Sequence, residues 1–141
     1  MADLEDVIDA AVTRLQTGYV GQTIAGRIHG TAPDSIVPPC MIVLPSTGDF
    51  LDFDATFEGK DDIELTIKVI VGAQATEAGQ RALMGYFSRS GSLSLRTVLY
   101  ADAQLGSTVA DLEILAARGW GDVEWAGVVY FGAELGIKVY T

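Results

Sequence analysis

The spacing of apolar residues at the start of the chain predicts an amphipathic α-helix over Asp3–Gln16. Apolar residues recur there at intervals of three and four, which places them on one face of a helix. They are Leu4, Val7, Ile8, Ala11, Val12 and Leu15. Acidic residues near the first turn suit the positive end of the helix dipole, and Gly18 ends the helix.

Strict alternation of apolar and polar residues predicts two well-defined strands. The first covers Ile63–Val71 and ends at Gly72. The second is a long strand that runs to the C-terminus, and one of its faces is apolar throughout. The residues on that face are Val129, Phe131, Ala133, Leu135, Ile137 and Val139.

Shorter runs predict further strands in the first half of the chain. Tyr19–Ile28 is interpreted as a short, bent strand because it contains two glycines, and Cys40–Leu44 as a buried strand. Between them, turn-forming residues make Gly30–Pro39 a loop. Asp49–Phe57 alternates imperfectly, and Glu58–Asp62 is typical of a polar hairpin turn.

Glycines divide the last third of the chain. Val109–Arg118 is predicted as a strand and Gly119–Gly121 as a turn. Val123–Trp125 is then expected to pair back, before a second turn at Gly127. This part of the chain is therefore predicted to be β-structure.

Two helices are predicted in the middle of the chain. Thr76 is a candidate N-cap for a helix that runs to Phe87, and Ser92 for a second helix that ends at Asp102. Strands joined by hairpins, with helices that do not alternate with them, are typical of the α+β class. We expect one domain over residues 1–141: a mainly antiparallel sheet with the N-terminal helix and the two central helices packed on one face.

The composition narrows the possible functions. The chain has 141 residues, the size of one domain, and nine basic against 19 acidic residues leave a formal charge of −10. A protein that grips nucleic acid through its phosphates needs a basic surface instead. Only 20% of the residues are charged, against about 25% ordinarily, so the apolar surplus favours self-association or a large partner. No apolar run reaches the roughly 18 residues of a membrane helix, and we expect no membrane partner.

Residues that commonly carry catalysis are scarce. His29 is the only histidine and Cys40 the only cysteine, too few for a zinc site with nitrogen and sulfur ligands. They are eleven residues apart, which leaves a Cys–His dyad open in principle, but a buried thiol near a loop histidine is the simpler interpretation. A lone cysteine also indicates a reducing compartment. With no nucleophile motif and no phosphate-binding glycine motif, we expect no catalytic residue and no cofactor.

Acidic residues crowd into one segment of the chain. They are Asp49, Asp52, Asp54, Glu58, Asp61, Asp62 and Glu64. Carboxylates in this number are able to bind Ca²⁺ or Mg²⁺ or to supply an acid–base pair, although the EF-hand pattern is absent. The favoured interpretation is a solvated acidic rim, or a face turned towards a channel or a basic partner.

Aromatic and proline residues supply candidate contacts with other proteins. Trp120 and Trp125 flank a glycine-rich segment, where they either anchor an interface or pack beneath a hairpin. The loop and the acidic segment contribute further candidates. The candidate contact residues are Pro38, Pro39, Phe50, Phe53, Trp120 and Trp125.

The order of the segments carries a resemblance to a known family. An acidic first helix leads to the Pro38-Pro39 pair and a short apolar strand. The later landmarks are Phe50–Phe57, the Asp61–Leu65 opening of the long strand, the helix with Gln80–Phe87, the Ser90-Gly91-Ser92 break and Gly132-Ala133-Glu134 in the last strand. In this order the chain resembles the small tail terminator and head–tail connector proteins of long-tailed bacteriophages, especially those of actinobacterial hosts.

The resemblance implies an α+β subunit that assembles into a ring, typically sixfold, within the virion. Such a ring caps the finished tail tube, stops its polymerisation and presents a surface to the head connector or stopper protein, while DNA passes through its lumen. The family brings no catalytic residues. An acidic channel wall agrees with this, because cationic walls would bind phosphates and slow the DNA. The virion would be assembled in the host cytoplasm.

Two alternatives remain open from the sequence. The first alternative is a head-side neck connector or stopper, because neighbouring neck proteins share the size and composition of this chain. A small metal-dependent enzyme that uses the acids between Asp49 and Glu64 is the second alternative.

Overall fold

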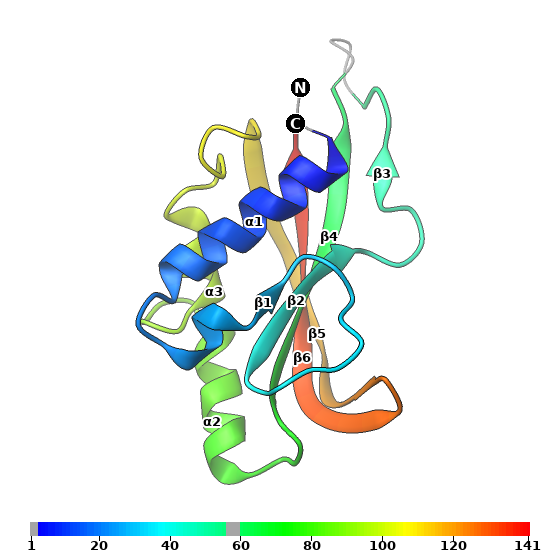
Figure 1. Ribbon diagram of the computed structural model, residues 1–141. Coiled ribbons are helices and arrows are strands. Elements are labelled where there is room, and N and C mark those ends of the chain that lie inside the picture. Colours follow the sequence, from blue (N-terminus) through cyan, green and yellow to red (C-terminus); the bar gives the residue numbers. More distant parts are fainter. Residues whose placement is uncertain (1–2, 56–59) are drawn as a thin grey trace.

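Six strands form one sheet in the computed structural model, which describes residues 3–55 and 60–141 (Figure 1). The strands are β1 (Ile28–His29), β2 (Cys40–Pro45), β3 (Leu51–Asp52), β4 (Asp62–Gly72), β5 (Asp111–Trp125) and β6 (Val128–Tyr140). They lie in the order β1-β2-β4-β6-β5, with β3 beside one end of β4. Only the β1–β2 pairing is parallel, so the predicted α+β class with a mainly antiparallel sheet is confirmed.

Three α-helices begin at side-chain caps. They are α1 (Leu4–Gly18), α2 (Glu77–Tyr86) and α3 (Leu95–Tyr100). At the start of α1, Asp3 and Asp6 each accept a hydrogen bond from the other's backbone N–H, which forms a capping box. Thr76 caps α2 as predicted, by accepting from the N–H of Gly79. The prediction that Ser92 caps the next helix is wrong, because the buried Ser94 takes that position and also donates to the carbonyl of Ser88.

The core lies between the helices and one face of the sheet. The strand register aligns Met41 with Val69 and Ala133, and Val43 with Ile67 and Leu135, so alternate residues of three strands point the same way. These side chains pack with apolar residues of all three helices in one cluster. The helices therefore share one face of the sheet, as predicted, and the opposite face is left to polar residues and one loop.

The segment predicted as a short, bent strand has another structure. Gly21 has a φ of 86°, and the chain turns there into a 3-10 helix, η1 (Thr23–Gly26). Tyr19 and Ile24 are both fully or almost fully buried. Their backbone carbonyls accept local hydrogen bonds, Tyr19 from the N–H of Gln22 and Ile24 from the N–H of Arg27. The turn is preferred because it places both side chains in the core, which an alternating strand would not.

The acidic segment forms much less strand than its alternation suggests. Among the residues of this segment that the structure describes, only Leu51–Asp52 forms strand pairs with β4, and a φ of 54° at Asp54 takes the chain out of the extended conformation. The predicted turn at Glu58–Asp62 lies partly outside the described residues. Phe57 and Glu58 are themselves outside them. Asp62 already belongs to β4.

The predicted turn at Gly119–Gly121 is wrong, because β5 continues through it to Trp125. The register against β6 shifts between Arg118 and Gly121, where positive φ values of 71° and 135° at Gly119 and Gly121 allow the strand to absorb one extra residue. A second shift lies between Ile114 and Ala116. These features are β-bulges. The chain reverses instead at Ala126–Gly127, a two-residue hairpin turn with positive φ at both positions, and the turn predicted at Gly127 is confirmed.

No helix within residues 3–55 and 60–141 combines the length and the apolar character needed to cross a bilayer. The helices are amphipathic instead: α1 buries Val7, Ala11 and Leu15 and turns its acidic residues outwards. Their apolar faces are used against the sheet.

Gly132 lies where the backbone of β4 leaves no space for a side chain on β6. A Cβ at this residue would overlap the carbonyl oxygen of Val69 and lie 3.1 Å from the Cα of Ile70. We expect Gly132→Ala to lower the free energy of unfolding by about 1–3 kcal/mol, the usual effect of overpacking. Chemical denaturation followed by circular dichroism measures this.

Gly26→Ala is the matched control for that substitution. A Cβ added at Gly26 would meet no atom within 4 Å, and the residue has no positive φ, so the extra methyl group has space. We expect it to change stability by less than about 0.5 kcal/mol. Equal stability of the two variants would show that β4 and β6 do not approach as closely as described.

Candidate assembly surfaces

The sheet face opposite the helices carries an ordered set of charges. Glu134 on β6 lies between two cations: its carboxylate oxygens are 3.7 Å from Lys68 Nζ and 3.9 Å from Arg118 Nε. Farther along the same face, Lys138 Nζ lies 3.6 Å from a carboxylate oxygen of Asp62. These pairs are partly exposed, so each stabilises the fold by no more than about 1 kcal/mol. They link β4, β6 and β5 by side chains and leave this face polar.

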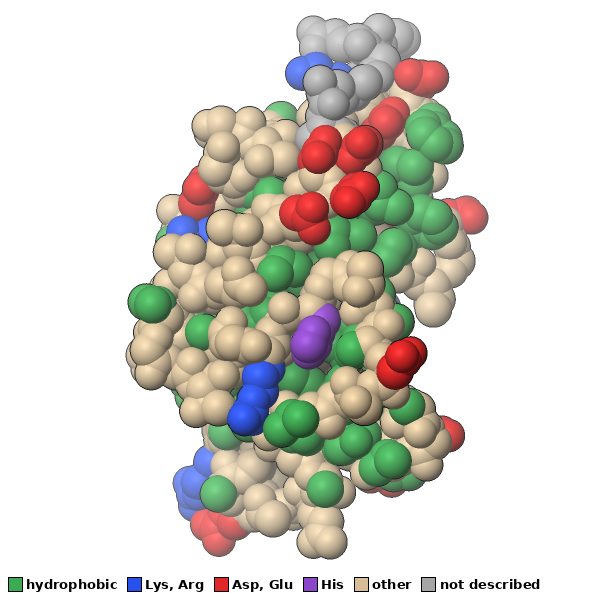
Figure 2. Space-filling model, viewed as in Figure 1, with side chains coloured by type: hydrophobic (Ala, Val, Ile, Leu, Met, Phe, Trp, Pro, Cys, Tyr) green, Lys and Arg blue, Asp and Glu red, His purple; other side chains and the backbone are tan. Residues whose placement is uncertain are grey.

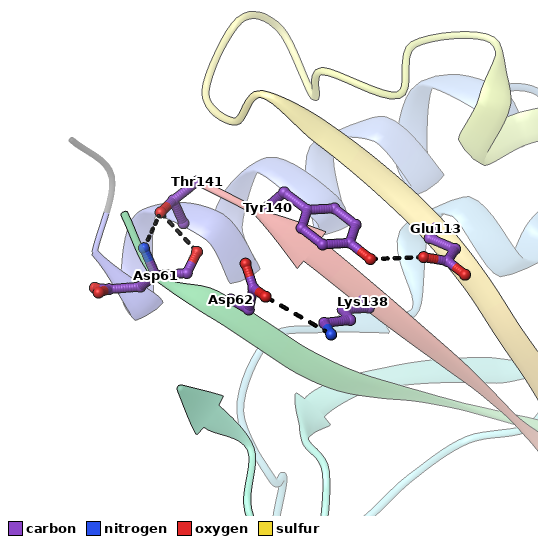
Figure 3. Close-up of polar contacts among 6 residues, drawn as sticks. All are labelled: Asp61, Asp62, Glu113, Lys138, Tyr140 and Thr141. Carbon is purple, nitrogen blue, oxygen red and sulfur yellow. Dashed lines mark hydrogen bonds and ion pairs between the residues drawn. The ribbon is translucent and has the colours of Figure 1, made fainter. Parts of the chain in front are cut away.

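Polar contacts also tie the strand ends near the C-terminus (Figure 3). The hydroxyl of Thr141 donates to the carbonyl of Asp61 at 2.8 Å and accepts from the N–H of the same residue at 3.0 Å. Between the neighbouring strands β6 and β5, the Tyr140 hydroxyl donates to the Glu113 carboxylate at 2.6 Å, and this hydrogen bond raises the pKa of Tyr140 to about 12. The edge strand β5 is therefore held to β6 beyond its backbone ladder.

The predicted acidic residues fall into two groups. Asp62 pairs with Lys138, and the Asp61 carboxylate accepts from the N–H of Asp54 at 3.0 Å. The side chains of Asp49, Asp52 and Asp54 are instead exposed. Glu58 lies outside the described residues. Within the described ranges, no three histidine, cysteine or acidic side chains are grouped so that they could hold a metal ion.

A second set of acids lies at the same end of the molecule. The beginning of α1, the strand β3 and the C-terminus all lie towards that end in Figure 1, and acidic side chains gather on that end of the visible face in Figure 2. The helix contributes Asp3, Glu5, Asp6 and Asp9. In the sequence the helix dipole explains Asp3, Glu5 and Asp6, and nothing in the spacing of the acids predicts that α1 and the segment after β2 contribute acids to the same end of the molecule.

We call residues Asp49–Asp54 the acidic arm. Its two aromatic side chains, Phe50 and Phe53, are 37% and 70% exposed. The arm is attached to β4 by the two β3 pairs and by a hydrogen bond from the N–H of Glu64 to the carbonyl of Phe50. It thus presents carboxylates and aromatic rings side by side on a short, anchored segment.

The strand β5 forms one edge of the sheet over 15 residues. Large apolar side chains on β5 and the start of β6 are about half exposed: Leu115, Trp120, Val128 and Val129. At one point the edge is covered, because the N–H of Ile114 donates to the hydroxyl of Tyr100 at 3.1 Å. A long edge with exposed apolar groups is a potential site of association.

The two tryptophans have different environments. Trp125 is half-buried, its indole N–H donates to the carbonyl of Pro33 at 2.9 Å, and Lys68 Nζ lies 5.5 Å from its ring centroid. Trp120 is 49% exposed and contacts Phe131 edge to face, with ring centroids 5.4 Å apart. Trp125 therefore fastens a loop to the sheet, while Trp120 keeps much of its surface open.

The loop between β1 and β2 covers one end of the polar sheet face. Ile36 packs there against Cys40, Ile42 and Ile70 in a small second core. Pro38 and Pro39 are half-buried, and the carbonyl of Pro38 accepts from the Arg27 guanidinium at 2.9 Å. Part of the surface of these two candidate contact residues is therefore buried within the subunit.

Cys40 and His29 show no catalytic arrangement. The thiol is fully buried, and no hydrogen bond joins it to His29 in the part of the chain that the structure describes. Burial raises the pKa of the Cys40 thiol to about 11, while the positive charge of Arg27 acts in the opposite direction. The thiol therefore stays protonated at neutral pH and is a poor nucleophile.

The lone cysteine provides a direct test of this core. With a pKa of about 11, the thiolate fraction at pH 8 is roughly a hundredfold smaller than that of a free thiol. We expect DTNB to label the folded protein at least that much more slowly than the protein unfolded in guanidinium chloride. Rapid labelling of the native protein would mean that the loop over Cys40 is not closed.

Comparison with known proteins adds no relative: no protein-family model matches the chain, and no curated protein matches it. The function is therefore argued from the order of the segments and from the surfaces described above. Those surfaces are the polar sheet face, the acid-rich end with the acidic arm, and the exposed edge at β5.

Proposed function

We propose that this protein is a ring-forming tail terminator of a long-tailed bacteriophage. The ring caps the tail tube, ends its polymerisation and joins the tail to the head connector, and DNA passes through its lumen. The observation that carries the proposal is the exposed β5–β6 hairpin, with its 15-residue edge strand and half-exposed apolar side chains. A surface of this kind suits contact between subunits.

The two edges of the sheet are unlike, which supports a head-to-tail ring. At one edge lies β1, which is only two residues long, and on the same side of β4 the acidic arm pairs with β4 through β3. The other edge is the 15-residue strand β5. Contacts between unlike surfaces form closed rings when the rotation between subunits completes a circle. A sixfold ring is the expectation from the family that the segment order resembles.

The distribution of charge supports a channel for DNA. The chain has a formal charge of −10, and acids from α1 and from the acidic arm share one end of the molecule. A wall of like charge repels a polyanion and does not retain it. In the proposed ring, acid-rich surface borders the lumen, and the tail tube and the head-side protein bind the two rims.

A phage that carries a nonsense mutation in this gene tests the proposal. We expect overlong tails and full heads without attached tails, because tube polymerisation is no longer stopped. Electron microscopy of the lysate measures tail length, and a complementing plasmid with the intact gene is the control. Tails of normal length together with heads that have lost their DNA would contradict the proposal and assign the protein to the head side of the neck.

A further inference from the structure

A small groove lies between the α2–α3 connection and the edge strand β5. Its volume is about 240 Å³, and its walls include the apolar side chains of Phe87, Leu95 and Ile114. Arg89 and Arg96 line the same groove. We call it the arginine groove. Pockets for small-molecule ligands usually measure about 300–1,000 Å³, so this groove suits one or two side chains of another protein better.

The two arginines extend from an ordered frame. The guanidinium of Arg96 lies 5.2 Å from the ring centroid of Tyr100, whose hydroxyl accepts from the N–H of Ile114 on β5. The connection that carries Arg89 is held by Ser94, which donates to the carbonyl of Ser88 at 2.6 Å. Among the described residues, neither arginine forms an ion pair. Both charges are therefore placed beside apolar surface without an anionic partner among these residues.

The acidic arm has the complementary chemistry. Asp49 and Asp52 are exposed and form no ion pair with any described residue, and they alternate with the exposed Phe50 and Phe53. A bound carboxylate beside a guanidinium and an aromatic ring in an apolar groove would satisfy both surfaces at once. Each chain thus carries two complementary surfaces. The arginine groove can bind carboxylates and aromatic rings, and the acidic arm presents both.

The two surfaces cannot meet within one chain. The strand β3, in the arm, lies on the β2 side of β4, whereas the groove borders β5 at the other edge of the sheet. Figure 1 shows β3 and the α2–α3 pair on opposite sides of the molecule. Contact between an arm and a groove therefore joins two copies head to tail.

From this juxtaposition we infer that the acidic arm of one copy docks in the arginine groove of the next copy. The inference rests on the proposed ring and specifies the contact that closes it. It assigns Asp49 and Asp52 to the subunit contact and leaves the acids of α1 for the channel. Since the contact pairs opposite charges, assembly should weaken as the salt concentration rises.

Charge reversal at single positions tests the contact. Arg96→Glu and Asp52→Lys each place like charges in every arm–groove contact, and we expect each to raise the concentration for half-assembly roughly tenfold or more. Asp54 is not substituted, because its φ of 54° lies in the left-handed region, where most other side chains would strain the backbone. Arg81→Glu is the control for the change of charge: Arg81 is an exposed residue of α2 outside the groove, and its ion pair is with Glu77 of the same helix. Assembly is followed by light scattering, with and without the tail tube protein, after circular dichroism has shown that each variant is folded.

Mixing the two variants gives the decisive measurement. In a one-to-one mixture, the groove of the Arg96→Glu chain can receive the arm of the Asp52→Lys chain, and the charges there are again opposite. The remaining contacts of such a mixed assembly keep the native charges. We therefore expect the mixture, and also the double variant, to assemble within a few-fold of the native protein. A ring with alternating subunits is possible for any even number of copies.

The outcomes separate this inference from the proposed function. If the native protein assembles but Arg96→Glu behaves like Arg81→Glu, or if mixing gives no rescue, the arm–groove contact is wrong and the ring stands. If Arg96→Glu loses only binding to the tail tube protein, the groove receives that protein and the inference is overturned. If the native protein remains monomeric both alone and with tube protein, the proposed function fails and the inference with it.

Discussion

The pairing of β4 with β6 is the constraint on which the rest of the structure depends. These strands lie far apart in the chain, and ten pairs of residues align them at the centre of the sheet. Gly132 permits their close approach where the ladder meets Val69 and Ile70. The same register sends one set of side chains into the core and the other set to the polar face. Helices, arm and edge strand all take their positions from this ladder.

Strong periodicity predicted the elements that depend on one buried face. The helix near the N-terminus and the strands now described as β4 and β6 each repeat apolar residues over many positions, so burial and local pattern agree. Tyr19–Ile28 differs because its buried residues are reached through a turn and a 3-10 helix, with no regular period. The glycines at 119 and 121 signal positive φ in either case, and only the partner strand decides between a turn and a bulge.

The candidate surfaces were only partly predictable. Exposure of Phe50 and Phe53 agrees with the interpretation of the arm as a contact segment, since both rings lie beside acids and not in the core. The acids near the first turn of α1 are explained in the sequence by a local effect, the helix dipole, whereas their position at the same end of the molecule as the arm comes from tertiary packing. Nothing in the sequence around Arg89 and Arg96 predicts that they line a groove. Their groove exists only because α2, α3 and β5 meet there, residues far apart in the sequence.

The exposed edge at β5 raises the question of why such a chain would not extend its sheet without limit. Two bulges interrupt the regular donor and acceptor spacing of β5, and the Tyr100 hydroxyl occupies the N–H of Ile114. Interruptions of this kind discourage continuous strand pairing between molecules. Association then falls to side-chain surfaces beside the edge, where charge and shape select one partner orientation. A contact with a fixed orientation is the kind that closes a ring, whereas unrestricted strand addition would produce fibres.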